Sequence, residues 1–348
     1  MRRKLFLSFI TLVLLITVFT TSTYAWFKIN SSAMINGFDF QVHGGEGFVI
    51  STNGTNFYSG LSKEQMLEAI VLGYDDETFE YQNGNLVFKE TKSKVTYEEL
   101  TKILSEKLLL APLTSNDGIN LEDMLGADTK SSSGQFIEFD LYFKTVSNVV
   151  EDNMKYEVYF NHEETSADDG TKVVPTTISS NISDLALTAP MTSIKGQLNK
   201  FDTITVSSAN AIRMSVEDTT KAEKQATIYE FYNSYDLGSY ATDYDGEDEL
   251  LNKLYNSNNN AMFTYYNNNK AHLHHLDPLS YENMPKTIRY ENNSGIEFEK
   301  PITTLYSGSE ANKITFRIWI EGWDADCFDG LFESISVKLT FKGERIYN

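Results

Sequence analysis

Several segments of this chain alternate apolar and polar residues one by one, and this pattern constrains the fold more strongly than any other feature of the sequence. Successive side chains of an extended strand point to opposite faces, so a period of two predicts strands with one dry face and one wet face. Such strands are typical of antiparallel sheets, and two sheets with their dry faces together form a β-sandwich. The alternation covers residues 137–144, 156–160, 212–217, 314–321 and 335–342.

Two further strands are predicted near the beginning of the chain, over residues 38–42 and 47–51. Asn53 and Gly54 follow the second of these strands. An Asn-Gly pair supplies the positive φ angles of a tight hairpin turn. We therefore expect the chain to reverse sharply at this pair.

Helices are the minority in the predicted structure. Ser62 and Gln65 form a capping box, and Thr96 and Glu99 form a second one. In a capping box, the hydroxyl side chain and the side chain three residues later satisfy free N–H groups at the start of a helix. These boxes predict helices, each with an apolar stripe at helical spacing, over residues 63–72 and 97–110.

Two stretches interrupt the series of strands. Residues 62–133 hold the predicted helices, and residues 218–311 hold much of the Tyr and Asn, with a short helix expected over 247–255. Strands from both ends of the chain share one pattern, so we expect a single domain over residues 26–348. The predicted fold is mainly β, an antiparallel jelly-roll-like β-sandwich that carries helical and Tyr/Asn-rich insertions at about 62–133 and 218–311.

The first residues of the chain have the layout of an export signal. Three basic residues precede an almost wholly apolar run over 5–19, and Thr23 and Ala25 give the small-residue pair of a cleavage site. We expect a signal peptide over residues 1–25, cut between Ala25 and Trp26, and an extracellular or cell-surface location for the rest. The alternative is an uncleaved leader that anchors the protein, since the run could cross a bilayer core of about 30 Å as a helix. Either way, only this N-terminal segment contacts a membrane.

The charge and the cysteine content narrow the class of protein. The chain carries a net charge of −20, and without residues 1–25 its 26 basic and 49 acidic residues give −23. Such a surface repels phosphate backbones, so we expect no nucleic-acid partner. Cys327 is the only cysteine, which excludes an intramolecular disulfide and a cysteine-based zinc site. A large hydrophobic core must therefore hold the fold.

Three histidines gather in one segment together with an aspartate. Imidazole nitrogen and carboxylate oxygen are both zinc ligands, so a metal site is one interpretation of this segment. The spacing matches no named closed site, and a polar loop face is the interpretation that we favour; we expect no cofactor. The residues are His272, His274, His275 and Asp277.

Two tryptophans in the C-terminal part, Trp319 and Trp323, are candidates for an interaction surface. Trp319 falls on the polar face of its predicted strand, where an exposed ring could contact a glycan or a neighbouring subunit. The alternative is a ring that caps the edge of the sandwich. The Tyr/Asn-rich stretch over 218–311 is open to two interpretations as well, an adhesive surface or an ordinary packed subdomain.

Four segments taken together resemble the TasA/camelysin-type surface proteins of Gram-positive bacteria. They are residues 24–27, 37–40, 136–143 and 318–327. The resemblance implies a secreted jelly-roll-like sandwich that a SipW-type signal peptidase processes and that is built into cell-surface or biofilm-matrix fibres. It also implies that fibres grow when the N-terminal strand of one subunit completes the sheet of the next.

An alternating segment just after the expected cleavage site fits the donor strand that this resemblance implies. Backbone hydrogen bonds would give such a contact its affinity, and alternate side-chain pockets would give its register. A head-to-tail contact does not close, so it propagates into a filament. The alternative is that the segment pairs within its own sandwich. One face of the segment carries Phe27, Ile29, Ser31, Ala33 and Ile35.

Enzymatic activity is not expected. Camelysin carries a metalloprotease attribution, but the zincin helix requires His-Glu-x-x-His, and residues 162–166 have Ser166 where the second histidine should stand. The leading hypothesis is an exported structural protein that associates with itself or with other surface proteins. The alternatives are a surface adhesin or glycan- or ligand-binding module that recognises its ligand through the insertion, and, with less support, a metal-dependent protease.

Overall fold

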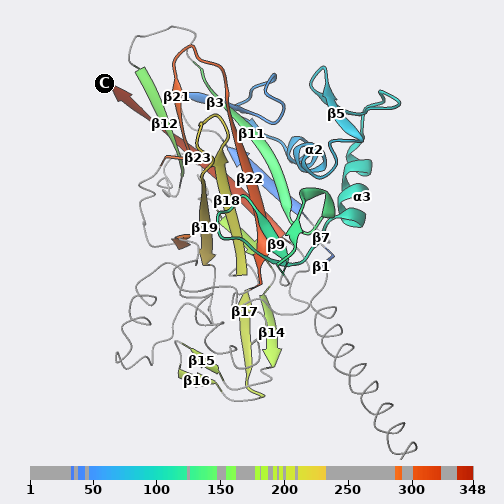
Figure 1. Ribbon diagram of the computed structural model, residues 1–348, viewed down its shortest axis with the longest axis vertical. Helices are drawn as coiled ribbons and strands as arrows, with labels where there is room; N and C mark the ends of the chain where they lie inside the picture. The colour runs from blue at the N-terminus through green and yellow to red at the C-terminus, as the bar shows by residue number, and fades with distance from the viewer. Residues whose placement is uncertain are drawn as a thin grey trace, which may run out of the picture.

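Two β-sheets packed face to face form the body of the protein, and two described α-helices lie at one side of them (Figure 1). The first and last strands of these sheets, β2 and β23, lie side by side in parallel, so both ends of the chain contribute to one body. The computed structural model describes residues 33–34, 38–43, 47–123, 126–146, 154–161, 177–180, 182–186, 191–193, 196–198, 201–207, 211–232, 287–291, 301–322 and 335–347.

The larger sheet has nine strands. Its path runs β10, β9, β8, β22, β18, β19 and β20, and β11 pairs with both β22 and β3. Its pairings are antiparallel, except those of β22 with β8 and of β19 with β20. The strands are β3 (Phe48–Ser51), β8 (Pro112–Thr114), β9 (Leu121–Asp123), β10 (Asp128–Thr129), β11 (Ile137–Thr145), β18 (Ile212–Asp218), β19 (Ala226–Tyr232), β20 (Thr287–Glu291) and β22 (Asn312–Glu321).

The smaller sheet has six strands, in the order β21, β12, β23, β2 and β4, with β13 also paired to β23. Only the pairing of β2 with β23 is parallel. The strands are β2 (Phe38–His43), β4 (Gly60–Leu61), β12 (Met154–Phe160), β13 (Thr177–Ser180), β21 (Thr303–Tyr306) and β23 (Ile335–Tyr347).

The other described elements are short strand pairs and helices. The pairs are β1 (Ala33–Met34) with β7 (Leu109–Leu110), β5 (Phe79–Gln82) with β6 (Asn85–Phe88), β14 (Ile182–Ala186) with β17 (Thr203–Ser207), and β15 (Met191–Ser193) with β16 (Gly196–Leu198). The helices are α2 (Lys63–Tyr74), α3 (Tyr97–Lys107) and the 3-10 helix η1 (Ser131–Ser133).

Aromatic rings from both sheets meet in the core between them. Phe143 of β11 and Phe316 of β22 contact Phe341 of β23, with ring centroids 5.1 and 6.2 Å apart. Tyr229 of β19 meets Phe160 of β12 at 5.0 Å with perpendicular ring planes. Such edge-to-face pairs add to the stabilisation that comes from burial of their area. The prediction of a mainly β, largely antiparallel sandwich is confirmed.

The alternating segments are all strands, but two of them are buried on both faces. Burial in β11 alternates as predicted. Strand β18, in contrast, is buried at every position, and β22 is buried from Ile314 to Glu321. The prediction of one wet face is therefore wrong for β18 and β22, because the segment from β8 to β10 covers their outer faces.

This covering segment packs closely on the larger sheet. A Cβ atom at Gly118 would lie 2.8 Å from the side chain of Ser215 and 2.9 Å from that of Ile228, and the φ of +72° at Gly118 also favours glycine. The segment shares a small second core with the outer face of the sheet. That core consists of Leu113, Leu121, Phe136, Ile228 and Trp319.

Both predicted capping boxes are present. Ser62 with Gln65 and Thr96 with Glu99 each make the two reciprocal hydrogen bonds of the motif. Helix α2 runs slightly past its predicted end. Helix α3 stops earlier than predicted, because the chain turns extended into β7, which pairs with β1.

Helix α2 closes one side of the sandwich, between β11 of the larger sheet and β2 of the smaller one. The helix lies close to β11 at Gly73, where a Cβ atom would lie 2.1 Å from the backbone oxygen of Glu138. A sheet edge covered by a helix in this way is protected from pairing with another chain.

The tight turn predicted at Asn53-Gly54 is a wider loop. Ile50 and Tyr58 exchange two backbone hydrogen bonds of 2.8 Å, and the loop lies between them. The side-chain oxygen of Asn53 organises the loop by accepting the backbone N–H groups of Thr55 and Asn56. The tight Asn-Gly turn of the described structure joins β5 to β6 instead, where Asn83 and Gly84 have φ angles of +50° and +80°.

The predicted insertions are partly built into the sheets. Strands β8, β9 and β10 come from the first stretch, 62–133, and join the larger sheet. Strands β19, β20 and β21 come from the second stretch, 218–311, and pair with β18, β19 and β12. The part of residues 218–311 that could form a separate insertion is therefore shorter than predicted. The helix expected over 247–255 lies outside the described residues.

The predicted leader, residues 1–25, also lies outside the described residues. Within the part of the chain that the structure describes, no helix has both the length and the apolar character needed to cross a membrane.

Replacing Gly118 with alanine should destabilise the protein more than replacing Gly126 with alanine. Gly126 is the matched control, because it has a similar φ of +83° but no neighbouring atom within 4 Å of the position of a Cβ atom. The strain of a positive φ costs about 1–2 kcal/mol at either site. The crowding against Ser215 adds about 1–3 kcal/mol at Gly118 alone. Urea unfolding of both variants measures this difference, and equal losses would contradict the close packing of the covering segment.

Candidate functional site

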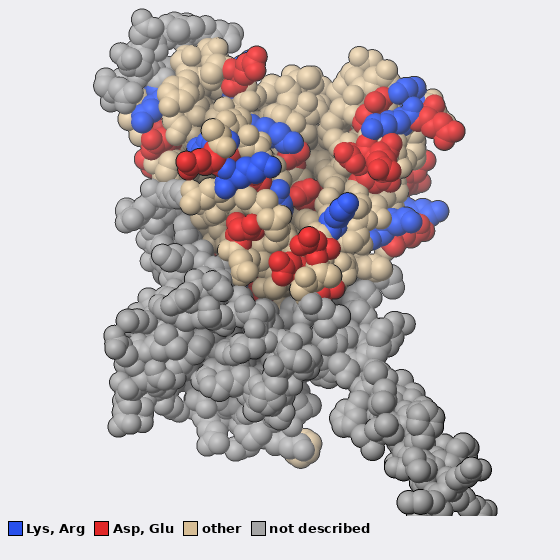
Figure 2. Space-filling model, in the orientation of Figure 1, with Lys and Arg blue, Asp and Glu red and all other residues tan. Residues whose placement is uncertain are grey.

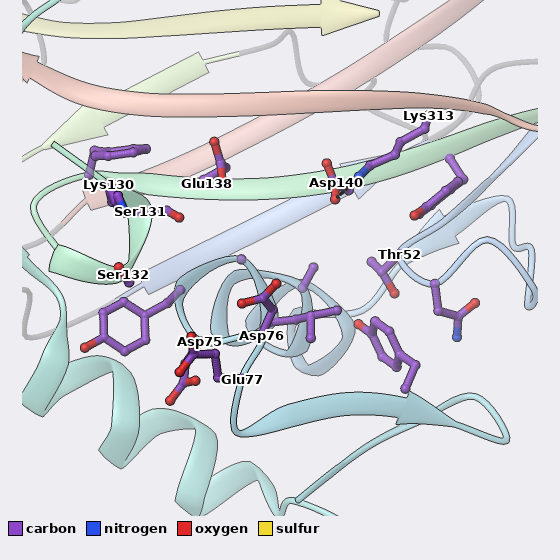
Figure 3. A pocket seen from close by; sticks show the side chains of 18 of the residues that line it. Thr52, Asp75, Asp76, Glu77, Lys130, Ser131, Ser132, Glu138, Asp140 and Lys313 are labelled. Atoms are coloured by element: carbon purple, nitrogen blue, oxygen red, sulfur yellow. Dashed lines mark ion pairs between the residues drawn. The ribbon is translucent and has the colours of Figure 1, made fainter. Parts of the chain in front are cut away.

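A polar groove with a volume of about 1010 Å³ lies beside helix α2 on the outer face of β11. Asp75, Asp76 and Glu77 lie on one side of it, across from Glu138 and Asp140 on β11 (Figure 3). The other walls come from the loop after β3, from β5 and from the turn around η1. The groove thus joins the first predicted insertion to the outer face of the sandwich.

The end of helix α2 places the three consecutive acidic residues. Asp75 caps the helix, and its carboxylate accepts the backbone N–H of Thr78 at 2.9 Å, which turns the chain away from the helix axis. No basic residue stands in the last helical turn. The partial negative charge at the C-terminal end of the helix therefore adds to that of the carboxylates.

The alternation along β11 places the opposite acidic residues. Its odd positions enter the core, so Glu138, Asp140 and Tyr142 share the outer face. Asp140 accepts hydrogen bonds from Lys313 at 2.8 Å and from Thr315 at 2.7 Å. Partial burial would lower the pKa of Lys313, but the hydrogen bond and the charge of Asp140 outweigh it and raise that pKa overall.

The charges in the groove are only partly compensated. Lys313 neutralises Asp140, and Arg317 neutralises Glu138 at 2.7 Å. Asp75, Asp76 and Glu77 take part in no ion pair among the described residues. A cationic or hydrogen-bond-donating ligand would therefore find the more favourable charge on the α2 side of the groove.

Tyr81 brings a buried hydroxyl to the wall of the groove. Burial raises the pKa of this phenol well above its usual range. Thr52 is its polar neighbour, but no group among the described residues meets the distance and angle of a hydrogen bond to the Tyr81 oxygen. A polar ligand atom or a water molecule could supply that partner.

The charge pattern extends over the surface around the groove. Acidic side chains gather over the region of α2 and β5 and over the region of β9, with basic side chains beside them (Figure 2). Within the described residues, no group of three or more His, Cys, Asp or Glu side chains is placed to hold a metal ion. The carboxylates and the buried hydroxyl group that line the groove fit a binding surface for polar ligands.

A buried polar network lies behind the groove, under the covering segment. Arg317 donates from Nε to Glu138 at 2.7 Å and from Nη1 to Glu217 at 2.8 Å. The carbonyl oxygen of Gly118 accepts the hydroxyl of Ser215 at 2.5 Å and lies 3.5 Å from Nη1 of Arg317. Arg317 and Glu217 are both buried, and each neutralises the charge of the other. Burial of either charge without its partner would be energetically unfavourable.

Trp319 is not an exposed contact residue. Its side chain is only 1% exposed and belongs to the second core, and its indole N–H donates to Glu321 at 3.2 Å. The prediction of an interaction surface at Trp319 is therefore wrong, because the covering segment buries the polar face on which the residue lies. Trp323 lies outside the described residues.

One residue of the predicted donor strand pairs within its own chain. Ala33 of β1 lies opposite Leu110 of β7 in a two-stranded antiparallel pair that belongs to neither sheet of the sandwich. The remaining predicted site residues lie outside the part of the chain whose placement is described. They are the cleavage pair Ala25 and Trp26, the donor residues Phe27, Ile29, Ser31 and Ile35, and the metal candidates His272, His274, His275 and Asp277.

The groove was not predicted, although its acidic residues leave a signal in the sequence. Asp75, Asp76 and Glu77 are consecutive and follow a predicted helix, which marks the end of that helix as acidic. Glu138 and Asp140 occupy the polar face of a predicted strand. Their meeting depends on the packing of α2 against β11, which is a contact between distant parts of the chain that no local pattern encodes.

Replacing Arg317 with methionine should destabilise the fold by about 3–5 kcal/mol, because it leaves the buried carboxylate of Glu217 without its partner. The matched control is Lys313→Met, which breaks the half-exposed pair with Asp140 and should cost at most about 1 kcal/mol. Urea unfolding at neutral pH distinguishes the two variants. A loss for Arg317→Met no larger than that of the control would contradict a structural role for the buried network.

The groove and the sandwich around it have no counterpart among the proteins compared. The chain matches no family model, no curated protein and no solved structure.

Proposed function

We propose that this chain is an exported structural protein of a Gram-positive-type cell surface or extracellular matrix, in which copies assemble into fibres through their N-terminal segments. The observation that carries the proposal is the order of its parts. A predicted leader precedes the alternating residues Phe27 to Ile35, and this segment leads directly to β2, the first strand of the smaller sheet. The resemblance to TasA/camelysin-type proteins supports the same conclusion.

The way in which the sandwich is held together suits a protein outside the cell. Its single cysteine allows no internal cross-link, and the interlocked rings of Phe143, Phe160 and Phe341 stabilise the contact between the sheets. Burial of apolar area does not depend on the redox state of the surroundings. The strongly negative net charge keeps such a protein soluble until specific contacts assemble it.

The sheets also offer edges for the addition of a strand. Among the described residues, β10, β3 and β20 lie at the ends of the larger sheet, and β21 and β4 lie at the ends of the smaller one. An edge strand presents backbone N–H and C=O groups that can pair with another chain. The pairing of β1 within its own chain spans only Ala33 and Met34 among the described residues, so an exchange for a longer pairing with a neighbour would gain hydrogen bonds.

Filament formation by the chain that begins at Trp26 tests this proposal. Electron microscopy should show filaments for the unaltered chain and none for the double variant Ile29→Pro, Ser31→Pro, because proline cannot donate a backbone hydrogen bond inside a strand. The control Ile29→Val, Ser31→Thr keeps strand-forming residues and should assemble. Both variants should melt at the temperature of the unaltered monomer. An unaltered chain that stays monomeric at every concentration would contradict assembly by strand donation.

A second candidate function is binding of a cationic ligand at the groove. The observation that favours it is the run of Asp75, Asp76 and Glu77 at the negative end of α2, whose carboxylates form no ion pair among the described residues. The ammonium group of Lys89 lies close by and donates to the backbone oxygen of Asp76. This candidate corresponds to a surface adhesin or ligand-binding module whose insertion is the recognition surface. The sandwich then acts as a scaffold, and binding and assembly are separable.

Calorimetry with a hexalysine peptide at low salt tests the second candidate. The triple variant Asp75→Asn, Asp76→Asn, Glu77→Gln should weaken binding at least tenfold, since each lost charge contact contributes about 0.5–1 kcal/mol near a protein surface. The control triple Glu90→Gln, Glu98→Gln, Glu106→Gln removes the same charge from exposed positions and should change binding less than twofold. Equal effects would show attraction by net charge alone.

A further inference from the structure

Helix α2 carries a buried carboxyl group that neither the groove nor the proposed assembly uses. Glu68 is 5% exposed and lies on the buried face of the helix together with apolar residues of the main core. It forms no ion pair among the described residues. Burial of a carboxylate without a countercharge is unfavourable, so this position favours the protonated form of the acid.

The hairpin of β5 and β6 lies against Glu68. The backbone N–H of Leu86 in β6 interacts with the carboxyl group, and the charge of Glu68 in turn affects the phenol of Tyr81 in β5. The hairpin is attached to the main core through the buried side chains of Phe79 and Leu86. Glu68 therefore lies at the joint between α2 and this hairpin.

Two charged groups among the residues whose side chains the structure describes act on Glu68. Glu64 lies one turn earlier on α2 and disfavours a second negative charge, while Lys94, just after β6, favours it. Lys94 and Glu64 are 3.6 Å apart and partly compensate each other. Helix α3 also packs against α2, but its buried side chains are Leu100 and Leu104, and its charged residues are exposed.

The balance of these effects places the titration of Glu68 in the neutral range. The pKa of Glu68 is raised overall from 4.5 to about 7. Burial is the largest cause, and the charge of Glu64 adds to the increase. The backbone N–H of Leu86 and the charge of Lys94 act in the opposite direction. A carboxyl group whose pKa is higher in the folded state than in the unfolded state contributes stability that is fully present below the unfolded-state pKa. This contribution is lost as the pH rises through the folded-state pKa. For Glu68 that window lies between 4.5 and about 7.

We propose that Glu68 makes the joint between α2 and the β5–β6 hairpin a proton-controlled clasp, which is tight when the buried carboxyl is protonated and loose when it is ionised. The hairpin carries Tyr81, which lines the groove. Loosening of the clasp as the pH rises from 4.5 to about 7 therefore changes the wall of the groove while the sandwich stays folded. The proposed clasp links the local acidity of the surroundings to the shape of this surface.

Hydrogen exchange of the hairpin amides tests the clasp. Protection factors in β5 and β6, corrected for the intrinsic pH dependence of exchange, should fall roughly 30-fold between pH 5.5 and pH 8, as linkage requires for a pKa that moves from 4.5 to about 7. Glu68→Gln keeps the shape of the protonated acid, so its hairpin amides should stay equally protected at both pH values. Glu90→Gln removes an exposed acid of the same region and should retain the full pH dependence.

Two further readouts keep the test decisive. Amides of β12 in the smaller sheet should show no such change, since they do not contact the clasp. If Glu68→Gln does not fold, the carboxyl carbon of Glu68 can be titrated by NMR in the unaltered protein, where we expect a midpoint near 7. A midpoint below about 5, or equal pH dependence in the unaltered protein and in Glu68→Gln, would overturn the clasp.

Discussion

The contact between the two sheets through interlocked aromatic rings is the interaction on which the rest of the structure depends. Phe341 of β23 contacts Phe143, Phe160 and Phe316, so one side chain of the last strand touches both layers of the sandwich. A chain with one cysteine has no covalent cross-link that could substitute for this packing. The helices, the covering segment and the groove are all positioned by elements that this core holds in place.

The outer face of the larger sheet is the second feature that organises the molecule. In an ordinary sandwich this face is solvated, but here the segment from β8 to β10 covers it over β18 and β22 and turns their alternating polar residues into a buried network. Arg317 connects that network to the groove, because it bonds to Glu217 inside and to Glu138 at the groove. Replacement of Arg317 therefore affects a buried charge, whereas replacement of Lys313 affects only the half-exposed carboxylate of Asp140.

The features predicted well from the sequence are those that local patterns encode. The period of two located the main strands, and the capping boxes of Ser62 and Thr96 located the starts of both helices. The errors have different physical origins. The burial of Trp319 and the placement of Asp75 across the groove from Glu138 depend on contacts between distant segments, which override local preference. The loop at Asn53 is instead set by local hydrogen bonds to the Asn53 side chain. The Asn-Gly pairs at Asn53 and Asn83 have the same composition, but of these two only the one at Asn83 directly joins two paired strands.

The parallel pairing of β2 with β23 has a consequence for how the protein reaches its folded state. Strand β23 pairs with β12, β13 and β2, so the smaller sheet lacks its central strand until residues 335–347 have been made. These residues follow every other strand of that sheet in the sequence. The smaller sheet is therefore completed in one late step that joins segments far apart in the chain.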